Sequence, residues 1–185
     1  MRIHCCALFS MFVAISMLGA GCSSDESVAP STAGARLDSA DAAARTVASF
    51  QNDPKASKFF DSAFGYAVFP KITKGALGIG VSDGRGEVFQ GGSLVGYVRA
   101  TSVTVGPQVG GQTFSEIIFF QSQFAFDKFT NNQFTGQASA AAVAGKGGDS
   151  SIADYNHGVA VFTSDNSGLI LAADIGGQKF HYIAK

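Results

Sequence analysis

Glycines recur within a stretch that otherwise resembles a β-strand, and this feature restricts the fold more than any other. From Phe69 to Gly86 the sequence is FPKITKGALGIGVSDGRG, with a glycine at every second to fourth position from Gly75 onward. Glycine weakens a strand because it has no side chain to pack, so it usually marks a bulge, a sharp bend or the close approach of another group. We therefore expect a strongly curled sheet.

Short runs of glycine, β-branched and aromatic residues continue from Gly65 to the C-terminus. The turn-like sequences SDGRG, QGGS and SDNSG separate them, which is typical of an antiparallel sheet. One pattern occurs twice, as VGGQTF at Val109–Phe114 and as IGGQKF at Ile175–Phe180. Two strands with the same paired glycines are expected to bend in the same way.

Helical patterns lie mainly before the predicted strands. We expect an amphipathic helix over residues 38–50, capped by Asp38. Its apolar face would comprise Leu37, Ala40, Ala44, Val47 and Phe50. A second helical stretch, NDPKASKFF, has Asp53 as its cap and Pro54 at the first helical position. The phenylalanines expected to anchor the core here are Phe59, Phe60 and Phe64.

A third helical stretch, SQFAFDKFTNN, interrupts the strands. Helices followed by strands predict an α+β domain with segregated layers. The expected fold is a curled antiparallel β-sheet, a half or nearly closed barrel, with N-terminal helices and one inserted helix packed on it.

The N-terminus resembles an export signal. Arg2 and His4 precede an apolar run, Cys5 to Leu18, that is too short to span a bilayer. It ends at LGAGC, which is similar to the bacterial lipobox, where cleavage leaves a diacylglyceryl-modified Cys22 as the first residue. Soluble secretion after cleavage at a nearby small residue is the alternative.

The expected organisation has three parts: a signal peptide over 1–21, a lipidated Cys22 with a flexible tether over 22–35, and a folded domain over 36–185. Two or three acyl chains hold a protein firmly to a membrane, whereas one holds it only marginally. Ser23 follows the cysteine, and a non-aspartate there implies passage to the outer membrane in Gram-negative bacteria. We therefore expect an exported protein anchored in the bacterial outer membrane.

Composition excludes several classes of site. Cleavage would remove Cys5 and Cys6, so no disulfide or cysteine metal site would remain. From Arg36 onward, twelve Lys and Arg balance twelve Asp and Glu, whereas nucleic-acid binders normally carry a basic excess. Fifteen phenylalanines would remain, and the chain has no Trp. Because membrane-interfacial surfaces usually recruit Trp and Tyr, most phenylalanines are expected in the core.

The motifs for nucleotide binding and catalysis are incomplete. GIGVSDG is spaced like a dinucleotide fingerprint, but SDGRG is expected to turn where the fingerprint requires a helix, so no nucleotide is expected. For Asp149, Asp154 and His157, whose spacing matches no metal-ligand pattern, a solvated loop is favoured. Glu116 could be an acid with a raised pKa, although a basic partner or an outward orientation is favoured. We expect no enzymatic activity, metal or cofactor.

Three ordered blocks resemble the SYLF domain family, found in bacterial lipoproteins and in eukaryotic proteins joined to SH3 or FYVE modules. They are SAFGYAVFPKITKGALGIGVSDGRGEVF, GGQTFSEIIFFQSQFAFDKFTNNQFTGQASAAAVAG and AVFTSDNSGLILAADIGG, within Leu37 to Ile183. The resemblance implies a curled-sheet α+β domain that binds membrane lipid. Eukaryotic members bind phosphoinositides and some bind actin, but an exported lipoprotein ordinarily meets neither, so neither is expected as a partner. The last block has Ile170 and Ala172 where Phe and Gly are usual, so no ligand contact is carried over to it.

A lipid-headgroup site is the hypothesis that explains the glycines and the nearby cations together. Lys71, Lys74 and Arg85 lie near the ends of strands whose glycines expose backbone amides, a combination that can hold an anionic headgroup. The glycines expected to let an acyl chain or helix approach are Gly75, Gly78, Gly80, Gly110 and Gly111. The favoured alternative is that they accommodate the N-terminal helix, with the cations solvated.

Two functions remain open at this stage. The first is a non-enzymatic, lipid-anchored envelope protein whose domain binds membrane phospholipids. The second is a structural or protein-interaction module that only Cys22 attaches to the membrane, with an envelope protein as partner.

Overall fold

The computed structural model describes residues 28–134, 154–165, 168–171 and 178–185. Over these ranges the chain forms an α+β domain on a curled, unclosed antiparallel sheet, which confirms the predicted fold class. The helices are α1 (Ala33–Gln51), α2 (Ser57–Ser62) and α3 (Gln123–Thr130), and the strands are β1 (Gly65–Gln90), β2 (Ser93–Phe120), β3 (Val159–Asp165), β4 (Gly168–Leu171) and β5 (Gln178–Ala184). None of these helices combines the length and the apolar character needed to cross a bilayer.

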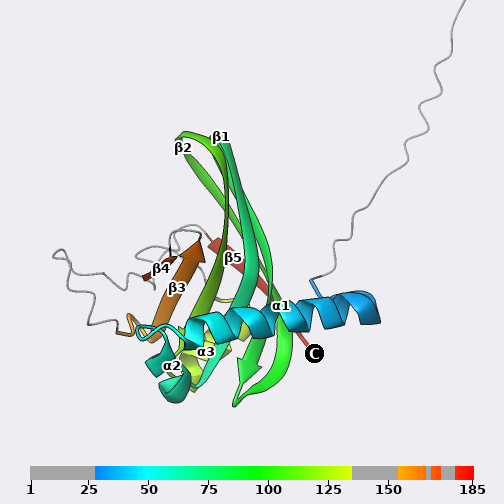
Figure 1. Cartoon of the computed structure of the whole chain (residues 1–185), viewed down its shortest axis with the longest axis vertical. Helices are drawn as coiled ribbons and strands as arrows, with labels where there is room; N and C mark the ends of the chain where they lie inside the picture. Colours follow the sequence, from blue (N-terminus) through cyan, green and yellow to red (C-terminus); the bar gives the residue numbers. More distant parts are fainter. Residues whose placement is uncertain (1–27, 135–153, 166–167, 172–177) are drawn as a thin grey trace, which may run out of the picture.

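The two long strands β1 and β2 form an antiparallel ribbon (Figure 1). Gly91 and Gly92 connect them in a two-residue turn, with φ values of 54° and 78° in the left-handed region that glycine favours. The turn predicted at QGGS is thus confirmed. The turn predicted at SDGRG is wrong, because residues 82–86 continue β1 and pair with residues 98–102 of β2.

β1 folds back on itself. A straight strand of its 26 residues would extend about 85 Å. A Cβ added to Gly84 would instead lie 2.6 Å from Ile72 Cγ1 and 3.1 Å from Lys71 O, so the two halves of this strand are in contact. The pairing with β2 also shifts register at three places, and such irregularities increase the local twist. The expected curling of the sheet at glycines is therefore confirmed at Gly84.

The remaining strands attach to the two ends of β2. Its last six residues pair with β3, which in turn pairs with β4, whereas residues 96–102 pair with β5. The part of the ribbon between these attachments projects beyond the helices, towards the top of Figure 1. We call this projecting part, residues 73–81 and 103–113, the ribbon tip.

α1 and α2 cover one face of the sheet, which we call the outer face; α1 crosses the strands in Figure 1. Ala43 and Phe50 of α1 and Phe59 of α2 are at most 2% exposed. They pack with apolar side chains of β1, β2 and β3, namely Val68, Ile117, Phe119, Ala160 and Phe162. This cluster fixes both helices on the sheet.

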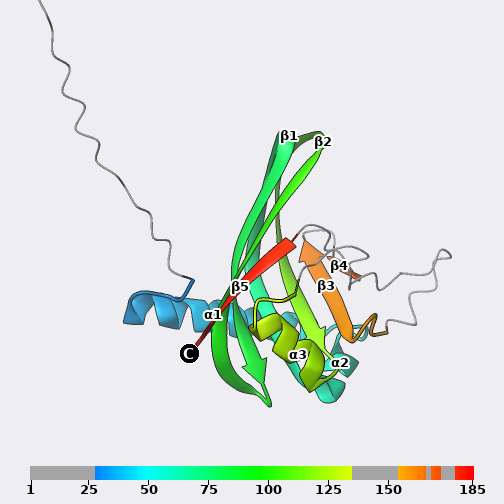
Figure 2. The ribbon, with the colours of Figure 1, turned by 180° about the vertical axis from the view of Figure 1, so that it is seen from behind.

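The opposite, inner face is filled by phenylalanines and by α3, which lies near β5 in Figure 2. Phe120 of β2 contacts Phe126 and Phe129 of α3, with ring centroids 5.6 and 4.7 Å apart. All fifteen phenylalanines of the expected mature chain are described, and of these only Phe124 is exposed. The prediction that most phenylalanines form the core is therefore confirmed.

α1 differs from the prediction in its start and in its buried face. It begins at Ala33 rather than near residue 38, because the side chain of Thr32 caps it by accepting a hydrogen bond from the Ala35 amide. Leu37, Ala40 and Ala44 are exposed, so the predicted apolar face is wrong over its first half. Val28, inside the expected tether, is 8% exposed, so this part of the expected tether packs against the domain.

Candidate functional site

The three predicted headgroup cations lie on β1 but do not share one face. Lys71 is exposed and precedes Ile72, which is buried in the inner-face core. Because neighbouring strand residues point to opposite faces, Lys71 points outward. Arg85 also points outward, since the adjacent Gly84 faces Ile72. Lys74 is partly buried and shares the orientation of Ile72. The structure therefore groups Lys71 with Arg85 and separates Lys74 from them.

Arg99 of β2 belongs to the same group, although the sequence patterns did not indicate it. It lies directly opposite Arg85 in the β1–β2 register, so the two side chains share the outer face. Like charges at such a position destabilise the strand pair, and Asp83 offsets this by accepting a 2.6 Å hydrogen bond from Arg99 Nε. We call Lys71, Arg85 and Arg99 the outer cations. Only the strand register, which sequence does not give, reveals the third member.

The predicted close-approach glycines lie on the ribbon. Gly75 and Gly110 have no described atom within 4 Å of an added Cβ, and Gly111 has a single one at 3.8 Å. Gly78 continues β1, and Gly80 is buried in it. The described part of the chain thus leaves the positions beside Gly75 and Gly110 open, and contact there with an acyl chain stays a prediction.

Close backbone approach occurs at other glycines. A Cβ at Gly65 would lie 2.7 Å from Phe89 O, and one at Gly86 would overlap Val68 O. The atoms nearest to the four most crowded glycines belong to strands and to α3 rather than to α1. These glycines therefore allow the sheet to fold on itself, which differs from the favoured expectation that glycines accommodate the N-terminal helix.

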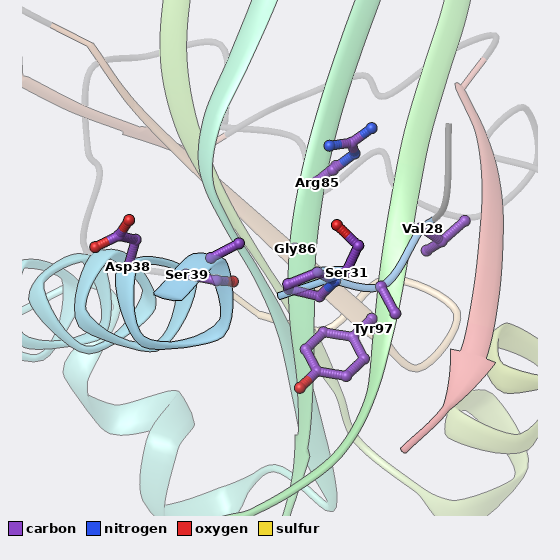
Figure 3. A pocket seen from close by; sticks show the side chains of 10 residues that line it. Val28, Ser31, Asp38, Ser39, Arg85, Gly86 and Tyr97 are labelled. Atoms are coloured by element: carbon purple, nitrogen blue, oxygen red, sulfur yellow. The ribbon is translucent and has the colours of Figure 1, made fainter. Parts of the chain in front are cut away.

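An open pocket of about 410 Å³ lies between the start of α1 and the outer face of the ribbon (Figure 3). Its lining includes Val28 before α1, Asp38 on α1, and Arg85 and Tyr97 on the sheet. Arg85 thus lies where the segment leading from Cys22 joins the domain. Cys22 itself, the expected lipid anchor, lies outside the described residues.

A buried carboxylate fixes α1 beside this pocket. Glu87 of β1 is 2% exposed, and its Oε1 accepts a 2.7 Å hydrogen bond from Ser39 Oγ on α1. Buried charged groups are costly unless hydrogen-bonded, so this contact helps to set where the helix begins on the sheet.

Four buried polar side chains form a layer on the inner face: Ser82, Ser102, Glu116 and Gln178. The hydroxyls of Ser82 and Ser102 are hydrogen-bonded at 2.6 Å, and Gln178 lies opposite Ser102 in the β2–β5 register. Gln178 Nε2 donates a long hydrogen bond of 3.5 Å to Glu116 Oε2. The other side-chain oxygens, Glu116 Oε1 and Gln178 Oε1, have no partner in the described part of the chain.

The orientation and the partner of Glu116 differ from the favoured prediction. The favoured interpretation, a basic partner or an outward orientation, is wrong because Glu116 is 1% exposed and Gln178 is its hydrogen-bond partner. Burial raises the pKa of Glu116 to about 7, and the Gln178 hydrogen bond offsets this only in part. The alternative, an acid with a raised pKa, is the one that the structure supports.

The loose group of acids and imidazole is not assembled in the described residues. His157 is exposed in a turn before β3, with a φ of 50°. Asp154 is also exposed and accepts a 2.7 Å hydrogen bond from the Tyr155 amide, while Asp149 lies outside the described residues. Among those residues, no three or more His, Cys, Asp or Glu side chains gather in a way that could hold a metal ion.

The comparisons with known proteins include one curated protein that is similar to this chain. No family model matches the sequence. A curated protein named Beta cell expansion factor A, from Aeromonas veronii, is 30% identical over 132 residues, which is 71% of this chain. The chain spans about half the length of that relative, since the match covers 50% of it.

Proposed function

We propose that the protein is a non-enzymatic, lipid-anchored member of the SYLF domain family whose domain binds anionic membrane phospholipid. The three ordered sequence blocks support the family, and the outer cations support the ligand class. Arginine and lysine side chains bind phosphate through charge-assisted hydrogen bonds, and arginine can do so with two parallel bonds.

The observation that carries this proposal is the position of Arg85. It lines the pocket beside Val28, so the segment from Cys22 enters the domain next to a cation. Six residue steps separate Cys22 from Val28 and span at most about 20 Å when fully extended. If Cys22 is acylated, this face of the domain therefore stays within about 20 Å of the bilayer surface.

The anchor is tested by metabolic labelling with a clickable fatty acid in a Gram-negative host. We expect wild-type protein to take up label and to fractionate with the outer membrane. Replacing Cys22→Ala should abolish labelling. Equal labelling of the two proteins would refute the lipoprotein assignment, whatever the domain itself binds.

The lipid-binding function is tested by flotation of the unacylated chain from Ser23 onward with vesicles. Both core clusters lie between residues 43 and 180, so this chain keeps them intact. We expect binding to vesicles that contain phosphatidylglycerol, and weaker binding to pure phosphatidylcholine. A triple variant that removes the outer cations, Lys71→Ala, Arg85→Ala and Arg99→Ala, should bind on the order of a hundredfold more weakly, because each basic residue near an anionic surface contributes about 1 kcal/mol.

The matched control removes three cations elsewhere: Lys58→Ala, Lys128→Ala and Lys185→Ala, all exposed. It changes the net charge equally and should bind nearly as wild type does. Equal loss in both triple variants would show that only net charge matters, and this would overturn the assigned site. No binding by the wild-type chain would instead favour the protein-interaction module.

A further inference from the structure

Large aliphatic side chains are exposed together at the ribbon tip. Leu77 is 85% exposed, Ile79 60%, Val81 54% and Val103 64%. They make up four of the seven large hydrophobic residues that are exposed in the described part of the chain. Single exposed hydrophobics are ordinary, whereas a contiguous group usually marks a surface that binds a partner or a membrane. We call these four residues the aliphatic patch.

Strand geometry places Ile79, Val81 and Val103 of the patch on the outer face. Val81 lies directly opposite Val103, so their side chains are neighbours on one face. Ile79 and Val81 alternate with Gly80 and Ser82, which are buried on the other side. The sequence LGIGV contains this alternation, and it is the signal that could have identified the patch without a structure.

The patch continues the face that carries the outer cations. Residues 79, 81, 83 and 85 follow one another on the same side of β1, so the surface changes from aliphatic to charged towards α1. The stretches 71–85 and 99–115 contain four Lys and Arg against one Asp, and Asp83 is paired with Arg99. The exposed aliphatic tip is therefore bordered by positive charge.

The position of the anchor fits a contact between this tip and the membrane. Val28 lies beside Arg85, and Ile79 is six residues from Arg85 along β1, about 20 Å. The segment from Cys22 to Val28 has a similar maximal reach of about 20 Å. An acylated Cys22 and the ribbon tip can therefore reach the same bilayer.

We propose that the ribbon tip inserts its aliphatic patch into an anionic lipid bilayer while the outer cations contact the headgroups. The inference rests on the proposed lipid-binding function and names the part of the domain that enters the membrane. The exposed side chains are Leu, Ile and Val, which suit the acyl region of a bilayer, below the headgroup level where Trp and Tyr are enriched. Cationic residues beside an apolar insertion favour anionic lipid.

The absence of tryptophan from the chain makes the insertion directly measurable. Ile79→Trp introduces a single indole at the tip of the unacylated chain from Ser23 onward. We expect its emission to shift to the blue on addition of phosphatidylglycerol vesicles and to be quenched by lipids brominated in the acyl chains. Ile183→Trp, at an exposed position of β5 away from the tip, is the matched probe and should show neither effect.

A second measurement needs no probe residue. The variant Ile79→Thr, Val81→Thr and Val103→Thr keeps β-branched residues in the strands while removing apolar surface. We expect its vesicle affinity to fall at least about tenfold, because less apolar surface leaves water on binding. Ile183→Thr is the control and should bind as wild type does. Circular dichroism and thermal unfolding should match between the variants, which verifies that the fold is retained.

The outcomes separate this inference from the proposed function. Wild-type binding combined with an unshifted, unquenched Ile79→Trp and undiminished binding of the threonine variant would overturn insertion and leave lipid binding intact. No binding by the wild-type chain would overturn both. A blue shift of Ile79→Trp without vesicles, accompanied by dimerisation in sedimentation, would assign the patch to a second copy of the chain and also overturn insertion.

Discussion

Glu116 is the residue whose chemistry departs most from its ordinary behaviour. It lies in a polar layer beneath the apolar inner face, with one carboxyl oxygen without a partner among the described residues. Burial favours the neutral form, which is why its pKa rises to about 7. A proton on this carboxyl also supplies a donor to a pair that otherwise presents two unpartnered acceptors, Glu116 Oε1 and Gln178 Oε1.

This shift predicts that the domain loses stability as the pH rises. Between pH 4.5 and 7 the folded state binds the proton that the unfolded state releases, so unfolding free energy falls with rising pH across that window. Each pKa unit corresponds to about 1.4 kcal/mol, so the full effect is on the order of 3 kcal/mol. Urea unfolding from pH 4 to pH 9 measures it.

The matched variant is Glu116→Gln, which keeps the shape and cannot ionise. It should be more stable than wild type above pH 7 and should lose most of this pH dependence. Asp127→Asn, at an exposed position, should show neither effect. If Glu116→Gln were less stable than wild type at pH 9, this would contradict the assignment of a buried, desolvated carboxyl to Glu116.

Two glycines of β1 differ sharply in what surrounds them. Gly86→Ala places a methyl group against Val68 O and the Phe69 ring, and should destabilise the domain by about 1–3 kcal/mol through overpacking. Gly75→Ala meets no described atom within 4 Å and should be neutral or slightly stabilising. Thermal unfolding compares the two, and equal effects would contradict the proposed folding of β1 on itself.

At the scale of the elements, α1 is held by a few residues that the sequence periodicity only partly identified. Phe50→Ala should destabilise the domain by about 3–5 kcal/mol, because its 1% exposed ring fills the outer-face core. Leu37→Ala, at 68% exposure, should change stability by no more than about 0.5 kcal/mol. Chemical denaturation distinguishes them, and a large effect of Leu37→Ala would show that the exposed face of α1 is covered in solution.

The turns show why element boundaries were only partly predictable. QGGS and SDGRG have the same kind of turn composition, yet only Gly91 and Gly92 adopt positive φ and reverse the chain. Gly84 and Gly86 are needed for another reason, since another part of β1 lies against them. The sequence shows where glycines occur. Only the three-dimensional contacts distinguish a glycine needed for a turn from one needed because another part of the backbone packs against it.

At the scale of the whole molecule, the order of helical and strand patterns was enough to predict the α+β class, and the glycines within the strands were enough to predict the curled sheet. The site was only partly predictable. Lys71 and Arg85 share the outer face, whereas Lys74, three residues after Lys71, points to the other face because neighbouring strand residues alternate. Arg99 of β2 joins them because it lies opposite Arg85 of β1. This register depends on the turn that connects the two strands.

Features from several parts of the chain together determine how the domain contacts a membrane. The tether entry at Val28, the outer cations and the aliphatic patch follow one another along one face of the ribbon. Since salt screens exposed charges but not apolar contacts, raising salt from 0.05 M to 0.5 M should weaken vesicle binding without abolishing it. Complete release at high salt would contradict a contribution from the aliphatic patch.

We expect the folded domain to bind an anionic bilayer without its acyl anchor. Flotation of the unacylated chain from Ser23 onward, with vesicles of increasing phosphatidylglycerol content, measures this binding. We expect the floated fraction to rise with the anionic content and to fall when the outer cations are removed. Recovery of the whole chain in the unbound fraction at every lipid composition would contradict it.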